Sequence, residues 1–343
     1  MKDKVVSGES SQGSIPEYLV SSWQRSKKYG IHPKDEKLQT LGFRQFTLSD
    51  SDQNLARVVG REIDAIWDSF GGRNWVVYAT NNQGIIIRAR HGSDPDPRLF
   101  SLNVGRRVSE SDLGTTAPSC AAHEKIPITL IGAEHYLNEF ANLFCCAVPL
   151  WGPTGNIIGV LNITGGEEFR SALVQKKLQA AAIKLENRIF LDSYRENLIY
   201  KIHYDTDFLD THMAGLIAVD NEANIISITR TALEMLDGIN PLKKRHNLKE
   251  ILSIEEIDNS GYAWSTRFSN GIVFFMKKVP ADSIDLALRD SAFRKSGAMK
   301  DLTDIHVMET VKNCDGNVSK AARVLKISRT TVYRLMKRAS ETD

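Results

Sequence analysis

The feature that most constrains this chain lies near its end. Residues 316–338, "GNVSKAARVLKISRTTVYRLMKR", contain seven Lys or Arg and no Asp or Glu, although all 343 residues together carry a formal net charge of only +2. Apolar residues recur through the segment at helical spacing. A basic face concentrated on short helices favours an anionic partner, and an α-helix fits the major groove of B-DNA.

The tail is predicted to fold as three helices. The first is expected to bury four apolar side chains: Leu302, Ile305, Met308 and Val311. "CDG" ends it, and Asn317 can cap the second helix, which runs to about Leu325. Ser328 can cap the third. The small side chains of Ala321 and Ala322 allow two helices to approach closely, as in a helix-turn-helix.

The predicted DNA contacts come from the caps and from the outward face of the third helix. Arginine there can donate two hydrogen bonds to a guanine edge, which discriminates by about 1–3 kcal/mol. The plainer alternative is a solvated basic surface helix. The residues predicted to contact DNA are Asn317, Lys320, Ser328, Arg329, Thr330, Thr331, Tyr333, Arg334 and Lys337.

Length and composition indicate a soluble chain of two or three domains, 42% hydrophobic and 25% charged. No apolar run approaches the roughly 18 residues of a membrane span, and the N-terminus lacks an apolar leader. The cysteines form no CxxC pair, which argues against a disulfide framework or zinc site. We therefore expect a cytoplasmic protein with no membrane partner, metal or cofactor. The cysteines are Cys120, Cys145, Cys146 and Cys314.

The pattern predicts a multidomain α+β chain. Hairpin signals "NNQG" and "GPTG" lie between β-rich runs in the first domain, and "DNEAN" and "SNG" lie between such runs in the second. The predicted parts are an N-terminal helical segment (1–50), an α/β sensor domain (51–166), a long linker or dimerisation helix (167–206), a smaller α/β domain (207–279), a helical linker (280–300) and the all-α DNA-binding tail (301–343).

The long helix leaves two roles open. No Gly or Pro interrupts residues 167–206, and apolar residues form an intermittent stripe: Leu178, Ala182, Leu185, Ile189, Leu198 and Ile202. Such a helix could cover the preceding sheet, or it could form a two-stranded dimer seam.

The tail resembles the Fis-type helix-turn-helix. The shared residues are Gly316, Asn317, Ala321, Ala322, Ile327, Ser328, Arg329, Thr331, Tyr333 and Arg334. Lys326 stands where relatives usually carry Gly in the turn, at a cost of about 1 kcal/mol if φ must be positive. The resemblance implies a dimer that places two recognition helices in successive major grooves.

The remainder resembles the acetoin-catabolism activator family. "SSWQRSKKYGIHP" is similar to its N-terminal segment, and "GTTAPSCAAHEKIPITLIGAEHY" with "LFCCAVPLWGPTGNIIGVLNITG" to its GAF sensor domain. The resemblance implies a GAF-like domain, then a PAS-like one, then the Fis-type tail. Relatives carry an ATPase acting on sigma-54 polymerase, but here GxxxxGK[ST] and "GAFTGA" are both absent. Because "GTTAP" also departs from the family's usual Gly-Thr-Asn, we do not carry the inducer acetoin over.

The GAF-like region supplies candidate effector-binding residues: Trp75, Thr115, Thr116, Glu134, His135, Tyr136 and Cys145. "AEHY" could instead be a structural element that closes the sheet. A Cys-His-Glu enzyme is disfavoured because adjacent residues on a strand point to opposite faces and "LFCCAVPL" is typical of a buried strand. A metal site from His135, Cys145 and Cys146 lacks ligand spacing.

The leading hypothesis is a non-enzymatic, dimeric transcription regulator that binds double-stranded DNA and responds to a small-molecule effector. RNA polymerase is a further possible partner. The alternative is a nucleoid-associated, Fis-like architectural protein, whose affinity would come mainly from phosphate contacts. The effector, the target operon and the sign of regulation do not follow from the sequence.

Overall fold

The computed structural model describes most of the chain, and the tail in part. The described residues are 15–40, 47–70, 74–92, 97–166, 173–236, 246–252, 263–268, 271–280, 307, 310–312, 314, 316–325, 329, 330, 332, 333 and 336. The chain divides into two compact units, and residues 150–158 and the region from Ala180 onward to Phe293 belong to the second. Each unit is described by itself. No helix within these described ranges is long and apolar enough to cross a membrane.

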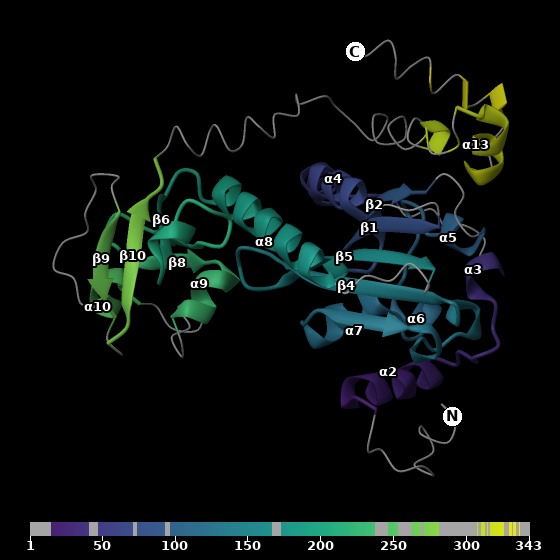
Figure 1. Cartoon of the computed structure of the whole chain (residues 1–343), viewed down its shortest axis with the longest axis horizontal. Helices are drawn as coiled ribbons and strands as arrows, with labels where there is room; N and C mark the ends of the chain where they lie inside the picture. The colour runs from purple at the N-terminus through teal and green to yellow at the C-terminus, as the bar shows by residue number, and fades with distance from the viewer. Residues whose placement is uncertain are drawn as a thin grey trace. The chain divides into compact units, whose positions relative to one another are not determined.

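The first unit is built on a five-stranded sheet in the order β2-β1-β5-β4-β3 (Figure 1). Its strands are β1 (Trp75–Asn81), β2 (Ile86–His91), β3 (Ile128–Ile131), β4 (Leu143–Trp151) and β5 (Ile157–Gly166). The hairpin predicted around "NNQG" is confirmed, because β1 and β2 pair antiparallel. Gly84 has φ +76°, which the tight turn requires and which glycine adopts without steric cost.

Helices cover both faces of this sheet. Helix α4 (Asp50–Phe70) contacts β1 and β2. The other face carries α2 (Glu17–Lys28), α6 (Glu110–Leu113) and α7 (Ala117–Glu124) (Figure 1). Short α3 (Lys37–Thr40) and α5 (Pro97–Phe100) complete the unit. The predicted N-terminal helix is therefore packed into the first unit: Leu19, Val20 and Trp23 share one apolar cluster with sheet residues.

The second unit contains another antiparallel sheet, in the order β8-β7-β6-β10-β9. Its strands are β6 (Leu198–His203), β7 (Gly215–Val219), β8 (Ile225–Ile228), β9 (Trp264–Arg267) and β10 (Val273–Lys278). Helices α9 (Arg230–Met235) and α10 (Leu248–Ile251) contribute to the apolar cluster on one face. Phe190, from the end of α8 (Leu173–Ser193), packs with residues of the other face.

The continuous helix predicted over 167–206 is wrong in its second part. Helix α8 ends at Ser193, and residues 198–203 form strand β6 between β7 and β10. "LIYKIH" places Ile199 and Lys201 on one face and Tyr200 and Ile202 on the other, so it satisfies a strand pattern as well as a helical one. Pairing with both neighbours outweighs the local helical preference.

The apolar stripe of α8 is buried within the single chain. Leu178, Ala182 and Leu185 are all fully buried in the single chain. Both roles of the long helix, the sheet cover and the dimer seam, remain predictions. The linker predicted at 280–300 lies outside the described residues from position 281 onward.

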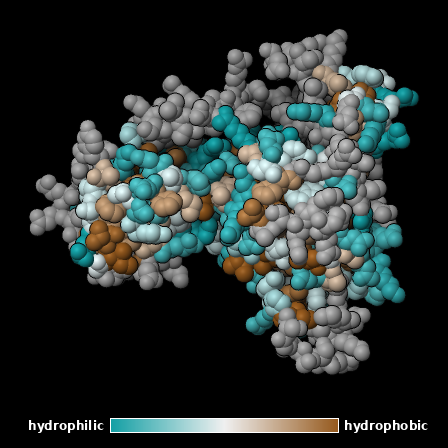
Figure 2. Space-filling view, viewed as in Figure 1, coloured by the Kyte–Doolittle hydropathy of each residue, from teal (hydrophilic) through white to brown (hydrophobic). Residues whose placement is uncertain are grey.

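Most large apolar side chains of the described residues are buried in these cores. On the face shown in Figure 2, hydrophilic residues predominate among the coloured atoms, and hydrophobic residues form small separate patches. The most exposed large apolar side chains of the described residues are Tyr204 (63%), Tyr333 (60%) and Leu173 (59%). Tyr333 stands out because it lies on the basic tail.

Candidate nucleic-acid interface and effector site

The first tail helix ends, and the second begins and ends, where the sequence predicts, whereas Ser328, the predicted cap of the third helix, lies outside the described residues. Gly316 has φ +77° and its N–H donates to the Val311 carbonyl (3.0 Å), which ends the first tail helix. Asn317 then caps α13 (Val318–Leu325): its Oδ1 accepts a hydrogen bond from the Lys320 N–H at 3.0 Å. The cap is therefore confirmed.

A small apolar cluster holds the tail helices together. Ala321 and Val332 are fully buried, and Ala322 is 5% exposed. Val307 and Val311 of the preceding helix, and Cys314 in the turn after it, join the same cluster. Residues 329–330 and 332–333 are helical, as predicted for the third helix. Because alanine side chains fill the contact, α13 and the third helix can approach closely.

The polar face points outward. Arg329, Thr330 and Tyr333 are exposed, Asn317 is exposed and Lys320 is half-buried. Arg329 Nη1 lies 3.5 Å from Ser319 Oγ of α13, a long contact that leaves the guanidinium available. The other predicted contacts, Ser328, Thr331, Arg334 and Lys337, lie outside the described residues, as does Lys326. The described part thus presents a donor-rich surface with one aromatic side chain.

Removing the cap should destabilise this surface. We expect Asn317→Ala to lower the free energy of unfolding of the tail helices by about 0.5–2 kcal/mol, because the Lys320 N–H loses its acceptor. Hydrogen exchange at the amides of residues 318–321 in the full chain measures this loss. Asn317→Ser, which retains a capping oxygen, is the matched control, and equal exchange in all three proteins would contradict the role of the cap.

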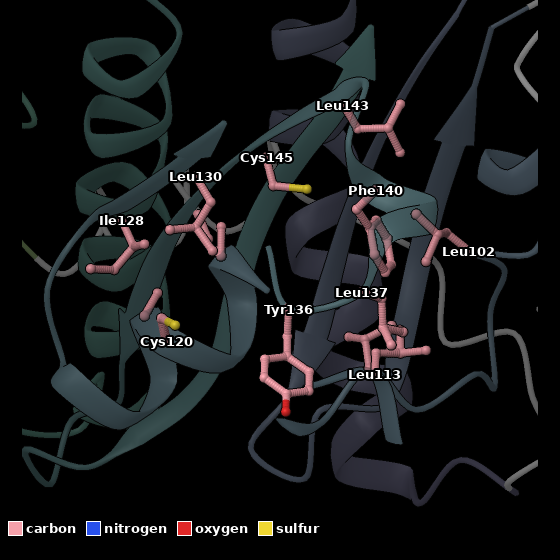
Figure 3. Packing of buried hydrophobic residues seen from close by; sticks show 14 of the residues in the cluster. Leu102, Leu113, Cys120, Ile128, Leu130, Tyr136, Leu137, Phe140, Leu143 and Cys145 are labelled. Atoms are coloured by element: carbon pink, nitrogen blue, oxygen red, sulfur yellow. The ribbon is translucent and has the colours of Figure 1, made fainter. Parts of the chain in front are cut away.

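The predicted effector residues do not form one group. Tyr136 and Cys145 enter the apolar cluster between the first sheet and α2, α6 and α7 (Figure 3). Trp75 does not: Val76 belongs to that cluster, so Trp75 faces the opposite side, where its ring packs edge-on against Phe144 at 5.2 Å. The pleat of β1 separates Trp75 from the others.

Two further candidates, Thr116 and Glu134, form hydrogen bonds with the nearby backbone. Thr116 caps α7 and forms a capping box with Ser119. Glu134 Oε2 accepts a hydrogen bond from the Ile131 N–H at 2.7 Å, and the Glu134 carbonyl accepts one from Trp23 Nε1 at 2.8 Å. These contacts give "GTTAP" and "GAEHY" a structural role in this fold.

Thr115 belongs to a buried polar cluster that joins α2 to the loop before α7. Its Oγ1 lies 2.8 Å from Ser22 Oγ and 3.0 Å from Ser26 Oγ. Arg25 forms an ion pair with Glu110 at 2.6 Å, and Ser22 also hydrogen-bonds that carboxylate. Sequence reasoning missed these α2 residues. Two serines spaced i, i+4 on one face of an amphipathic helix were the available signal.

Burial disfavours Cys145 as a catalytic nucleophile. Burial raises the pKa of the Cys145 thiol to about 12, although its hydrogen bond with Thr164 acts in the opposite direction. His135 is fully buried, stacks on Phe140 at 5.4 Å and bonds the Gly132 carbonyl through Nδ1. A thiol held neutral at physiological pH is a poor nucleophile. Among the described residues, no cluster of three His, Cys, Asp or Glu side chains could hold a metal ion.

Comparison with known protein families identifies the family of the C-terminal tail. Residues 305–338 match the family described as "Bacterial regulatory protein, Fis family". These residues include α13 and the exposed Arg329, Thr330 and Tyr333.

Full-chain comparisons find transcriptional regulators. The chain is 26% identical over 232 residues to the "Acetoin catabolism regulatory protein" of Cupriavidus necator, covering 64% of this chain and 34% of that protein. It is 24% identical over 226 residues to the "Signal-transduction and transcriptional-control protein" of Clostridium beijerinckii, covering 64% and 35%. The matched region thus spans about a third of each relative.

Among solved structures, a chain of the "Crystal Structure of the E.coli DhaR(N)-DhaL complex" aligns with 77% of this chain over 100% of its own length, with a TM-score of 0.46 and 14% identity. The predicted resemblance to acetoin-catabolism activators is confirmed by the sequence relatives. The C-terminal segment is a Fis-type helix-turn-helix, carried by a chain that is similar to bacterial transcriptional regulators.

Proposed function

We propose that the protein is a sequence-specific, non-enzymatic transcription regulator. The observation that carries this proposal is the Fis-type tail, whose apolar cluster around Ala321 and Val332 leaves Arg329, Thr330 and Tyr333 exposed on one helix. A helix with this exposed face can lie in the major groove, where arginine and polar side chains contact base edges.

A dimer is part of this proposal. Paired recognition helices would contact two half-sites about 34–36 Å apart, which gives a palindromic operator. Footprinting of the full chain on its genomic targets tests the idea. One or a few palindromic sites near promoters are expected. Dispersed protection without a common sequence would instead indicate an architectural, nucleoid-type protein and overturn the proposal.

The units before the tail would sense a small molecule. We assign a GAF-like role to the first unit and a PAS-like role to the second, supported by the similarity to regulators and by the two antiparallel sheets. Effector binding would change operator affinity through a coupling of about 1–3 kcal/mol, or roughly 5- to 150-fold. Operator affinity measured with and without a metabolite panel tests this, and no response to any member would contradict it.

Activation through sigma-54 polymerase is not part of the proposal. The sequence contains neither a GxxxxGK[ST] phosphate loop nor a "GAFTGA" loop. Regulation would then proceed by repression or through contact with polymerase that requires no ATP hydrolysis. A purified transcription assay tests this with an ATP analogue in which the β–γ bridging oxygen is replaced, so that a regulator cannot hydrolyse it. Transcriptional regulation by the protein should be the same with this analogue as with ATP.

A further inference from the structure

Among the described residues, one face of the second sheet packs against α8 at one end only. Ile199 of β6 and Val279, which follows β10, form an apolar cluster there with Phe190 of α8. His203 ends β6 and points to the same face, because side chains an even number of residues apart on a strand share a face. Its partner across the strands is Phe275 of β10, which is half-buried and lies outside that cluster. The α8 cluster therefore leaves the end of the face at His203 and Phe275 uncovered.

Exposed apolar side chains gather around His203 at this end. In the loop between β6 and β7, the rings of Tyr204 and Phe208 lie 4.3 and 5.0 Å from the His203 ring, measured between centroids. Val273 begins β10 and shares a face with Phe275, two residues later. Apolar residues that are exposed together and bordered by charged groups are typical of an interaction surface. We call these four residues the loop–strand patch: the exposed Tyr204, Phe208 and Val273, and the half-buried Phe275.

Charged side chains of both signs border the loop–strand patch. The loop contributes Asp205, Asp207 and Asp210, whereas the strands contribute Lys201, Lys277 and Arg267 on the same face. Asp210 pairs with both lysines, at 3.2 and 2.8 Å, which holds the loop over the strands. Asp207 and Arg267 are both exposed. The border thus carries three acidic and three basic groups, and no net charge.

This mixture of charges indicates what kind of partner fits the patch. Nucleic acid would require an excess of basic groups. A strongly acidic or strongly basic peptide would leave one set of border charges facing like charge. A second copy of the same surface satisfies both sets, because a two-fold axis places the acidic loop of one protomer against the basic strands of the other. The patch is therefore self-complementary in charge as well as apolar at its centre.

We propose that the loop–strand patch is the surface through which two copies of this chain associate about a two-fold axis. Its four apolar side chains would pack at the centre of the contact, and the charged border would set the orientation of the two protomers. This inference rests on the dimeric regulator of the proposed function, and it names the surface that forms the dimer. The second unit then has a role in assembly.

Sedimentation equilibrium of the full chain without DNA tests this surface. Val273→Glu should raise the dissociation constant of the dimer at least about tenfold, because both copies then carry a carboxylate among apolar side chains and opposite the acidic loop. The strand should tolerate this change, since the new carboxylate would lie across from Arg267. Ile226→Glu is the matched control, because Ile226 is 40% exposed, against 38% for Val273, and lies on the far edge strand β8 of the same sheet. It should shift the dissociation constant less than about twofold.

The two-fold arrangement makes a second prediction. Asp207→Lys and Arg267→Glu should each weaken the dimer about 3- to 10-fold, because each reversal brings like charges together twice. An equimolar mixture of the two variants should recover the wild-type dissociation constant within about twofold, since each reversed charge then meets its opposite on the partner.

A dissociation constant unchanged by Val273→Glu would overturn the inference, and it is the result expected if α8 or the tail alone held the dimer. A mixture no tighter than its two component variants would overturn it as well, as would a wild-type chain that stays monomeric. Should Val273→Glu fail to fold, Tyr204→Ser replaces it, because Tyr204 is 63% exposed and its truncation should weaken the dimer about 3- to 10-fold. Footprinting tests the proposed function separately, so a palindromic site together with a dimer that does not respond to these variants would contradict this inference alone.

Discussion

Trp23→Ala is expected to lower the free energy of unfolding of the first unit by about 3–5 kcal/mol. Trp23 is 3% exposed and belongs to the cluster that contains Tyr136 and Cys145. Its truncation would leave a cavity under α2 and would also remove the hydrogen bond from Nε1 to the Glu134 carbonyl. The change therefore combines lost apolar contact with an unpaired backbone acceptor.

Urea unfolding of the full chain measures this loss, with proteolysis reporting whether α2 detaches. Tyr29→Ala is the matched control: Tyr29 follows the same helix but is 55% exposed, so a change within about 0.5 kcal/mol is expected. If Trp23→Ala costs less than about 1 kcal/mol, α2 is not an integral part of the first unit. Its serine–threonine cluster would then need another explanation.

Arg329→Ala is expected to reduce affinity for the operator by about 5- to 150-fold, or about 1–3 kcal/mol, and to relax preference at one base pair. Arg329 is exposed on the third tail helix, and its only described tie is the 3.5 Å contact with Ser319. Little protein structure would be lost with it. The effect should therefore appear in base discrimination and hardly in the free energy of unfolding.

Lys320→Ala separates base contacts from phosphate contacts. Lys320 lies in the first turn of α13, half-buried, where its ammonium can reach a phosphate. Its loss should weaken specific and random DNA alike and reduce the slope of log affinity against log salt by about 0.9. Equal losses on both DNAs for Arg329→Ala would contradict its assignment to base recognition.

Local patterns in the sequence predicted much of the fold. The "NNQG" and "GPTG" hairpins and the Asn317 cap depend on residues within one turn, and the structure contains them. Strand β6 was missed because "LIYKIH" fits two periodicities, and the choice depends on β7 and β10. No reasoning confined to residues 167–206 could have supplied those partners.

The prediction of the effector-binding residues also failed to anticipate contacts between residues that are distant in the sequence. Trp75 and Cys145 both suggested a ligand site, yet strand pleating places them on opposite faces of one sheet. Thr115 proved to be a partner of Ser22 and Ser26, some ninety residues earlier. Which side chains meet across such a separation is decided by packing of α2, and a linear pattern carries little information about it.

The central claim is that the Fis-type tail of this chain selects particular DNA sequences. Duplexes enriched from a random library by the full chain should be compared with scrambled duplexes of equal length and salt. We predict a ratio of dissociation constants of at least about 10³, as specific regulators have. A ratio below about ten, with both affinities falling equally as salt rises, would contradict the account.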